Sequence, residues 1–481
     1  MKKHFMAVLG TSLYEPVIYR MPWEKGEDEA KILEKREHEF VQLAFLEGMR
    51  EELKNGARAT IFVTKGSKSS NWEDRKYTGR EIDNPPKWIP KEKNIEHLMK
   101  TGLKTQIHEL FGEDAEQIEM VEIPDGKSGE EIKGIFKIIY DCIGEDEKLI
   151  FDVTHSFRSI PMIAISVLNY AKVLKKCVIG GVYYGAYEPG KKIADVVDIT
   201  YLNDILEWTS AADVFIKYGN AGPMNELVKM EKNRLENKEK GRFAALERKI
   251  NSYEVFTGAI ATCRGQNVDG WKLSNKDGRS IKSAVEVIRK NSNDKALEVQ
   301  KEMELLVPLV EKVDEKMEPF QVEENYKIGM AVVQWCIDHN MTQQGYTALE
   351  ETVKTFLCHH YKLDEGEEDI RDGFIGNLVN SMKKWKMETQ DTAEVRNQFY
   401  SQWMQENSGE AEQRQEIAKL FIDNVAFDFL DNVGELKDIR NDINHFGMNA
   451  RPMHTEDLKK KLIELKEKIL RHMEDIDEKK A

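Results

Sequence analysis

The chain has 481 residues and a formal net charge of −15 at pH 7, with 40% hydrophobic and 33% charged residues. This length exceeds one ordinary hydrophobic core and predicts two or three domains, and the composition is typical of a folded globular protein. No run approaches the roughly 18 to 20 apolar residues of a membrane span, and the opening MKKHFMAVLG leads into charged sequence without a signal-peptide cleavage region. We therefore expect a cytoplasmic protein that has no membrane partner.

The cysteines and the acidic charge exclude further classes. The five cysteines are far apart and form no C-x-x-C pair, so neither a disulfide framework nor a structural zinc site is indicated; they are Cys142, Cys177, Cys263, Cys336 and Cys358. Nonspecific affinity for nucleic acids depends on clustered Lys and Arg, which this acidic chain does not favour. Any nucleic acid is therefore expected to be held locally.

Residues 1–205 alternate short apolar runs with helical patterns. The expected strands are HFMAVLG, ATIFVT, QIEMVEI, KLIFDVT and CVIGGVYYGAY, with patterns such as GEEIKGIFKIIYDCIG and PMIAISVLNYAKVLKK between them. This order predicts an α/β domain with a doubly wound, Rossmann-like, mostly parallel sheet that has helices on both faces. The segment 11–26 is interpreted as a hairpin insertion, and 65–100 as a long loop followed by a helix.

The rest of the chain has no strand pattern. Residues 206–320 are dense in charge and helical in period, as in NELVKMEKNRLENKEKGRFAALERKI, and predict a helical connector. Residues 321–481 predict an all-α C-terminal domain that starts with NYKIGMAVVQWCIDHN.

Two stretches of the first domain have the residues of a ligand site. In doubly wound sheets, ligands bind at the carboxyl ends of the strands, where backbone N–H groups and helix N-termini face anions. The first stretch, Gly10, Thr11 and Ser12, closes the first strand with a glycine and two hydroxyls. The second follows the strand KLIF and supplies phosphate-compatible donors around one turn: Thr154, His155, Ser156, Arg158 and Ser159.

Simpler interpretations of these stretches remain open. Thr154 or Ser156 would cap the following helix, and Arg158 would pair with a surface carboxylate. The chain lacks a Walker motif, and G-x-G-x-x-G is missing from the strand ends, which disfavours ordinary nucleotide binding. The stretch YYGAYE, with Tyr184 and Gly185, ends the next strand, where an aromatic ring could stack on a base or belong to the core.

The motifs D-x-T-H-S-F-R-S-x-P and Y-Y-G-A-Y-E together resemble the CARF domains of CRISPR-associated proteins, over roughly residues 3–200. This resemblance implies a sensor of cyclic oligoadenylates, the second messengers that type III CRISPR complexes make. It also implies a homodimer that binds the ring across its two-fold interface. The GTS and THSFRS stretches would contact the ring's phosphates and riboses, and we favour cyclic tetra-adenylate over cyclic hexa-adenylate as the activator.

The stretch RNDINH, residues 440–445, lies at the end of an amphipathic helix whose apolar stripe includes Val433, Leu436, Ile439 and Ile443. On an ideal helix His445 points about 140° away from Arg440, at 100° per residue. One straight helix therefore does not aim both side chains easily at one atom. Either the helix end distorts before Gly447, the long arginine wraps around, or a second copy of the helix completes the site.

The same stretch has the R-[N/D/H]-x-x-x-H form of the HEPN ribonuclease motif, and residues 321–478 resemble HEPN domains. Arg440, Asn441 and His445 are the matching positions. The resemblance implies RNA cleavage by attack of the 2′-hydroxyl, with histidine moving protons, arginine stabilising the phosphate and Asn441 orienting one of them; no metal is required. The second Arg-Asn pair, Arg396 and Asn397, is set aside because no histidine follows it.

These observations predict a cytoplasmic, homodimeric, metal-independent endoribonuclease that cleaves single-stranded RNA when a cyclic oligoadenylate binds. Two alternatives stay open. The protein could be a sensor without nuclease activity that relays to a partner, or the first domain could cleave its own activator, with His155, Thr11 or Ser12 positioning a ribose hydroxyl. A structural interpretation of RNDINH, as a surface histidine beside an arginine that bonds a helix terminus, also remains.

Overall fold

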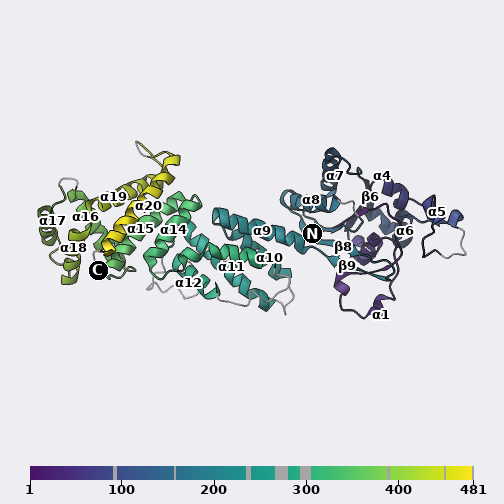
Figure 1. The fold of residues 1–481 in the computed structure, drawn as a ribbon, viewed down its shortest axis with the longest axis horizontal. Helices are drawn as coiled ribbons and strands as arrows, with labels where there is room; N and C mark the ends of the chain where they lie inside the picture. Colours follow the sequence, from purple (N-terminus) through teal and green to yellow (C-terminus); the bar gives the residue numbers. More distant parts are fainter. Residues whose placement is uncertain are drawn as a thin grey trace. The chain divides into compact units, whose positions relative to one another are not determined.

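The computed structural model of the chain consists of two compact units, Met1–Asp204 and Ile205–Ala481. The structure describes residues 1–89, 95–155, 159–234, 240–265, 280–292, 305–386, 390–448 and 451–478. The first unit is a mixed α/β domain and the second contains helices only in its described part (Figure 1). An α/β N-terminal domain followed by a helical C-terminal region is therefore confirmed.

The first unit is built on a seven-stranded sheet with the order β2-β9-β8-β7-β1-β3-β6. All neighbouring strands are parallel except β8 and β9, which are antiparallel. The strands are β1 (Lys3–Leu9), β2 (Ile18–Arg20), β3 (Arg58–Val63), β6 (Ile118–Glu122), β7 (Lys148–Asp152), β8 (Val178–Ala186) and β9 (Ile193–Asp198). The mostly parallel sheet that the alternating pattern predicts is confirmed.

Helices cover both faces of this sheet because its central strand is apolar on both sides. Phe5, Ala7 and Leu9 of β1 belong to one buried cluster, whereas Met6 and Val8 belong to the other. The first cluster includes residues of α2 (Val41–Gly48), α3 (Arg50–Lys54) and α6 (Leu103–Phe111); the second includes residues of α7 (Gly129–Cys142) and α8 (Ile160–Lys175). Each fully buried large side chain contributes about 1.5–3 kcal/mol to folding.

The predicted hairpin in residues 11–26 is wrong. This segment holds a single short strand, β2, which extends the edge of the main sheet parallel to β9, with Ile18 opposite Ile193. A 3-10 turn, η1 (Pro22–Glu24), follows in place of a returning strand. Pro22 lacks a backbone N–H, so it favours the start of a turn over a second paired strand.

Residues 65–100 contain several short elements instead of one long loop. They are α4 (Lys65–Ser67), η2 (Lys68–Trp72), β4 (Arg75–Lys76), α5 (Arg80–Asp83), η3 (Ile95–His97) and β5 (Met99–Lys100), and β4 pairs antiparallel with β5. Residues 90–94 lie outside the described part. The described part of the unit also contains two short elements, α1 (Glu29–Ile32) and η4 (Gly112–Gln117).

The second unit has two apolar clusters that share helix α14 (Asn325–Asp338). One cluster lies among α9 (Tyr201–Tyr218), α10 (Gly222–Arg234), α11 (Lys240–Ala261), α12 (Ile281–Ser292), α13 (Val307–Glu315) and η6 (Glu318–Phe320). The other lies among α15 (Thr342–His360), η7 (Asp369–Gly376), α16 (Asn377–Lys386), α17 (Ala393–Glu406), α18 (Glu412–Asn424), α19 (Phe427–Asn444) and α20 (Thr455–Glu478).

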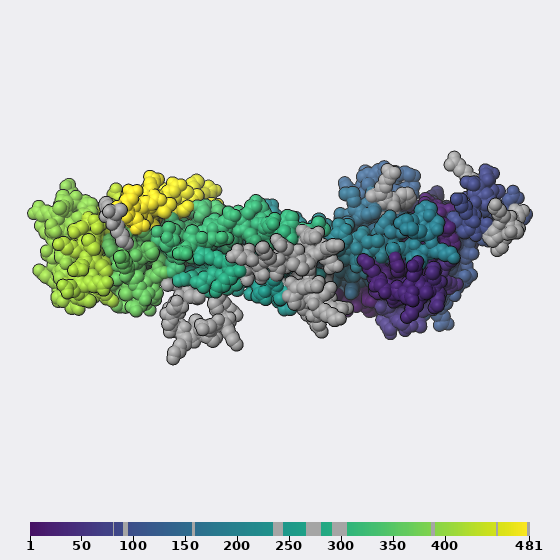
Figure 2. All heavy atoms as spheres, turned by 60° about the horizontal axis from the view of Figure 1, so that its bottom comes forward, coloured from purple at the N-terminus to yellow at the C-terminus, as the bar shows by residue number. Residues whose placement is uncertain are grey.

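Helix α20 shows how the sequence pattern produces this packing. Its buried residues Leu462, Leu465, Ile469, Met473 and Ile476 recur every three or four positions and form one apolar face. Atoms of this helix are visible on the surface in yellow in Figure 2, and the exposed residues of the helix are mostly charged. In the described part of the chain, no helix combines the length and the hydropathy that a bilayer-crossing segment needs.

Candidate functional site

The loop after β1 is held by a buried asparagine from a distant segment. The Asn71 Nδ2 atom donates hydrogen bonds to the carbonyl oxygens of Gly10 and Ser12, each over 2.8 Å. Lys100 donates to the Asn71 Oδ1 atom and pairs with Glu39 at 3.1 Å. Asn71 and Lys100 are both buried. These contacts hold the backbone of the loop in place. The side chains of Thr11 and Ser12 remain exposed.

The structure brings this loop together with the turn after β7. The rings of Tyr14 and His155 stack with their centroids 3.9 Å apart. A Cβ atom added to Gly10 would lie 2.8 Å from the carbonyl oxygen of His155, which no real side chain tolerates. Position 10 therefore needs glycine, because the two backbones approach each other closely.

Thr154 connects this turn to the end of β8. Its hydroxyl donates to Asp152 Oδ1 and accepts a 2.7 Å hydrogen bond from the backbone N–H of Gly185. The backbone N–H of Thr154 also donates to Asp152 Oδ1, at 3.1 Å. Burial raises the pKa of Asp152 to about 7, although both Thr154 bonds favour the charged form. Thr154 is thus a structural link, and its hydroxyl is already engaged.

The environment of His155 favours its uncharged form. Burial lowers the pKa of its imidazole to about 4, so the ring is uncharged near neutral pH. Its Nε2 atom is buried and has no hydrogen-bond partner among the described residues. Such an orphaned polar atom costs free energy unless a ligand or another group satisfies it.

The other predicted residues of this site differ in exposure. Tyr184 is exposed at the end of β8, where its ring is available for stacking. Ser159 is the N-cap residue of α8 and makes no capping hydrogen bond with its side chain. Ser156 and Arg158 lie outside the described residues. The predicted residues that are described thus come from the ends of three neighbouring strands, β1, β7 and β8.

In the second unit, Arg440 lies just before the last turn of α19 and pairs with a buried carboxylate of α15. Its Nε atom donates to Glu350 Oε2 at 2.7 Å, and its Nη2 atom donates to Glu350 Oε1 at 2.8 Å. The Glu350 side chain is 8% exposed and that of Arg440 is 26% exposed. Sequence reasoning missed Glu350 because it lies 90 residues from Arg440 and belongs to no recognisable motif.

His445 is the residue at which α19 ends. The helix stops at Asn444, and the backbone N–H of His445 donates to the carbonyl oxygens of Asn441 and Ile443. The His445 side chain is exposed, and Asn441 is half-buried one turn before it. Within the described residues, no side-chain hydrogen bond joins Arg440 or Asn441 to His445. Phe446 and Gly447, which follow His445, both adopt positive φ angles, so the helix does not continue past His445.

Arg396, which is set aside because no histidine follows it, also differs from Arg440 in its contacts. Its Nε and Nη2 atoms bind Asp391 at 2.6 and 2.8 Å, and its Nη1 atom donates to the carbonyl oxygen of Ile422. All three of its nitrogens are therefore engaged in structural contacts, as expected for an arginine that joins a helix start to a neighbouring helix end.

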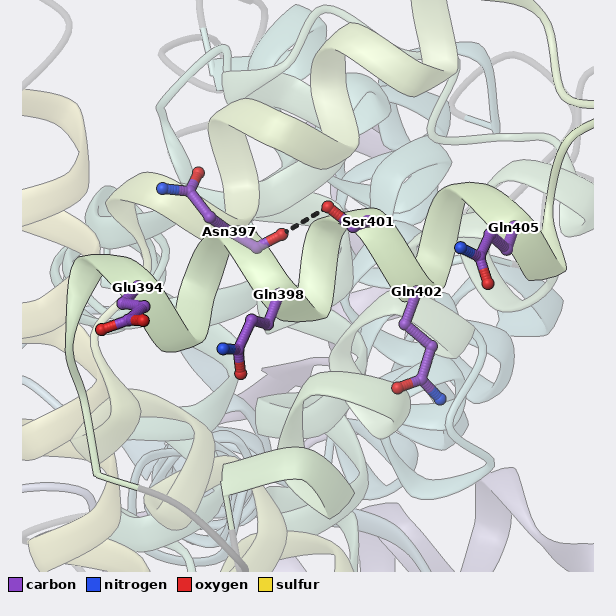
Figure 3. Close-up of a pocket in the computed structure, with 6 residues that line it drawn as sticks. All are labelled: Glu394, Asn397, Gln398, Ser401, Gln402 and Gln405. Carbon is purple, nitrogen blue, oxygen red and sulfur yellow. Dashed lines mark hydrogen bonds between the residues drawn. The ribbon is translucent and has the colours of Figure 1, made fainter.

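An open depression of about 820 Å³ lies along α17 and is far in sequence from both candidate sites. Figure 3 shows its polar lining, in which the Ser401 hydroxyl donates to the carbonyl oxygen of Asn397 at 2.9 Å. Its lining residues are Glu394, Asn397, Gln398, Ser401, Gln402 and Gln405. None is a predicted site residue. Among the described residues, no three His, Cys, Asp or Glu side chains gather closely enough to hold a metal ion.

Comparisons with known proteins add a relationship that the geometry alone does not provide. No protein-family model matches the chain. The chain is 24% identical over 247 residues to CRISPR-associated protein MJ1674 of Methanocaldococcus jannaschii, a match that covers 50% of this chain and 34% of that protein. The match thus spans about a third of the relative's length.

A search of solved structures finds Csm6 of Enterococcus italicus bound to cyclic hexa-2′-fluoro-hexa-dAMP. The TM-score is 0.36 at 8% identity, with 98% of this chain and 95% of that chain covered. The resemblance to CRISPR-associated proteins that the sequence motifs indicate is confirmed by the curated relative.

Proposed function

We propose that this chain is a CRISPR-associated sensor of cyclic oligoadenylate whose helical unit cleaves single-stranded RNA without a metal. In this proposal residues 1–205 are a CARF sensor domain, 206–320 a connector and 321–481 a HEPN ribonuclease domain. The relative's name supports the CRISPR assignment. The observation that carries the nuclease assignment is the placement of Arg440 and His445 in one exposed helix end, with Arg440 anchored in the core and His445 open to solvent.

The proposed reaction uses the 2′-hydroxyl of the RNA as the nucleophile. A base removes its proton, the oxygen attacks the adjacent phosphorus, and an acid protonates the departing 5′ oxygen. An imidazole performs either proton transfer near neutral pH, which assigns this role to His445. The guanidinium of Arg440 holds the phosphate and stabilises the charge that develops on its oxygens. Asn441 orients the histidine or the phosphate.

A homodimer would supply two copies of this motif, and therefore two histidines, one for each proton transfer. We propose this arrangement because one copy of the motif provides a single imidazole, whereas the reaction needs a base and an acid. Ligand binding in the first unit would activate cleavage by stabilising the competent state more than the idle one. We favour cyclic tetra-adenylate as the activator over cyclic hexa-adenylate.

For the first unit, the supporting observation is the convergence of the loops after β1, β7 and β8. The exposed hydroxyls of Thr11 and Ser12, together with backbone N–H groups, suit phosphate and ribose oxygens. The exposed ring of Tyr184 suits stacking on an adenine. These contacts are those that a ring of adenylates linked by phosphodiesters requires.

His155 supports a second activity at the same three loops. Its imidazole is neutral, and its buried Nε2 atom has no partner among the described residues, so it would accept a hydrogen bond from a ribose hydroxyl of the bound ring and position that hydroxyl. Cleavage of the bound activator by the first unit would then act as a timer that ends the response.

The test is cleavage of a fluorescent single-stranded RNA in EDTA, with and without cyclic tetra-adenylate. We expect cleavage that depends on the activator, survives EDTA, is lost in His445→Ala and falls to a low but measurable rate in Arg440→Ala, because Arg440 stabilises charge and moves no proton. His359→Ala, which removes another exposed histidine of the same unit, is the matched control and should keep activity.

The same reactions report on the other assignments. Absence of cleavage with either cyclic tetra- or hexa-adenylate would make the chain a sensor without nuclease activity. Loss of the intact ring over time in the wild type, but not in His155→Ala, would identify the activator as a second substrate.

A further inference from the structure

The two side chains of the ion pair between Glu350 and Arg440 differ in their exposure to solvent. The carboxylate end is buried in the core of the second unit, whereas the guanidinium end reaches solvent. A buried ion pair is weak evidence for a stabilising role, because removing two charges from water offsets much of their attraction. Its geometry, by contrast, is restrictive, since two parallel N–H···O bonds fix both the position and the plane of the guanidinium.

Arg440 keeps N–H donors that Glu350 does not engage. A guanidinium has five N–H groups, and Glu350 engages one on Nε and one on Nη2. Among the described residues, Nη1 and the second N–H of Nη2 have no hydrogen-bond partner, and one N–H of Nη1 together with that of Nη2 forms an edge that suits bidentate binding of a phosphate. In Arg396 the corresponding Nη1 atom is engaged by the carbonyl oxygen of Ile422, so that no such edge remains.

A second contact joins the same two helices beside the histidine. The Gln343 Nε2 atom donates to Asn444 Oδ1 at 3.2 Å. Gln343 and Glu350 are seven residues apart and therefore lie on one face of α15, two turns from each other. Through this face α15 contacts the C-terminal part of α19 both at Arg440 and at Asn444, the residue that precedes His445.

We propose that Glu350 is a positioning residue for RNA cleavage, which aims the free edge of the Arg440 guanidinium at the scissile phosphate. The proposal rests on the proposed ribonuclease function. Glu350 itself touches neither RNA nor the reacting atoms. It acts by holding the arginine in the orientation that binding the transition state requires, so that the arginine does not have to be ordered in each reaction cycle.

The decisive variant is Glu350→Gln, which keeps the size of the side chain but has only one acceptor oxygen for the two N–H groups. We expect kcat for RNA cleavage to fall by about 10- to 100-fold, the range that a small misplacement of a reacting group produces, with a much smaller change in KM. Glu350→Asp keeps the charge on a shorter side chain and should recover part of the lost activity.

Two controls separate positioning from a general loss of structure. Asp391→Asn breaks the equivalent pair with Arg396 and should leave kcat unchanged. In the double variant Arg440→Ala/Glu350→Gln, the second substitution should cause no further loss of activity, because the residue that Glu350 positions is absent. Thermal unfolding midpoints of all variants show whether each protein is folded at the assay temperature.

Three results would overturn the proposal. The first is a Glu350→Gln protein with wild-type kcat. The second is an equal loss of activity in the wild-type and Arg440→Ala backgrounds, which indicates a structural effect. The third is cleavage by Glu350→Gln without activator, which makes the pair a latch that restrains Arg440. A wild-type protein that cleaves no RNA contradicts the proposed function instead, so the two failures are distinguishable.

Discussion

At the scale of single residues, Asp152 shows how tertiary structure changes the chemistry of a side chain. It ends β7, has no exposed surface, and receives two hydrogen bonds from Thr154. Burial nevertheless dominates and raises the pKa of its carboxyl group from 3.8 to about 7. Its neighbour His155 shifts in the opposite direction, because burial disfavours the charged form of both groups.

These shifts predict a specific dependence of stability on pH. The native state binds the Asp152 proton more tightly than the unfolded state, so its contribution is full below pH 3.8 and is lost as the pH rises to about 7. The unfolding midpoint of the wild type, relative to Asp152→Asn, should therefore decrease between pH 4 and pH 7. The contribution of His155 has the opposite sign but is present in both proteins. A difference that stays constant or grows over this range would contradict the prediction.

At the scale of elements, the end of α19 contains an unfavourable residue at a position where glycine is preferred. Phe446 follows the C-cap with φ +60°, and its side chain is 91% exposed. Helices commonly end with glycine in this left-handed conformation, which costs other L-residues about 1–2 kcal/mol. Because so much of its surface is exposed, the aromatic ring has little packing against the rest of its own unit to offset this cost. Phe446 directly follows His445 in the chain.

Phe446→Gly should accordingly stabilise the protein, by about 1 kcal/mol, through relief of this backbone strain. Phe446→Ala removes the same ring but keeps the strain, so it is the matched control and should show no such gain. Urea denaturation followed by circular dichroism measures both. Equal stabilities of the two variants would show that the backbone at position 446 is unstrained.

At the scale of the whole molecule, the charge of −15 limits how the proposed RNA substrate can be held. A chain with this charge should contact few phosphates outside the proposed cleavage site. The slope of log kcat/KM against log salt concentration should then be shallow, no steeper than about −1.5, because each phosphate contact with a single strand contributes about −0.7. Measurement between 50 and 300 mM KCl tests this. A steep slope would reveal an extended basic surface, which a dimer could assemble.

The sequence by itself determined the features that follow from local pattern. Alternation of apolar runs predicted the parallel sheet, and the three-to-four residue spacing of apolar positions predicted the helix α19, because these periods depend only on neighbouring residues. The motifs around Thr154 and Arg440 also follow from short spacings. The expected hairpin at residues 11–26 was wrong, because only the pairing partner of β2, which lies more than 170 residues away, decides where that strand goes.

The tertiary structure alone decided what surrounds the motif residues. Asn71 supports the Gly10 loop from 61 residues away, and Glu350 holds Arg440 from 90 residues away. The neutral state of His155 and the raised pKa of Asp152 depend on burial, which no local pattern specifies. The physical reason is common to all of them: orientation, desolvation and hydrogen-bond partners are set by atoms that are near in space and far apart in the chain.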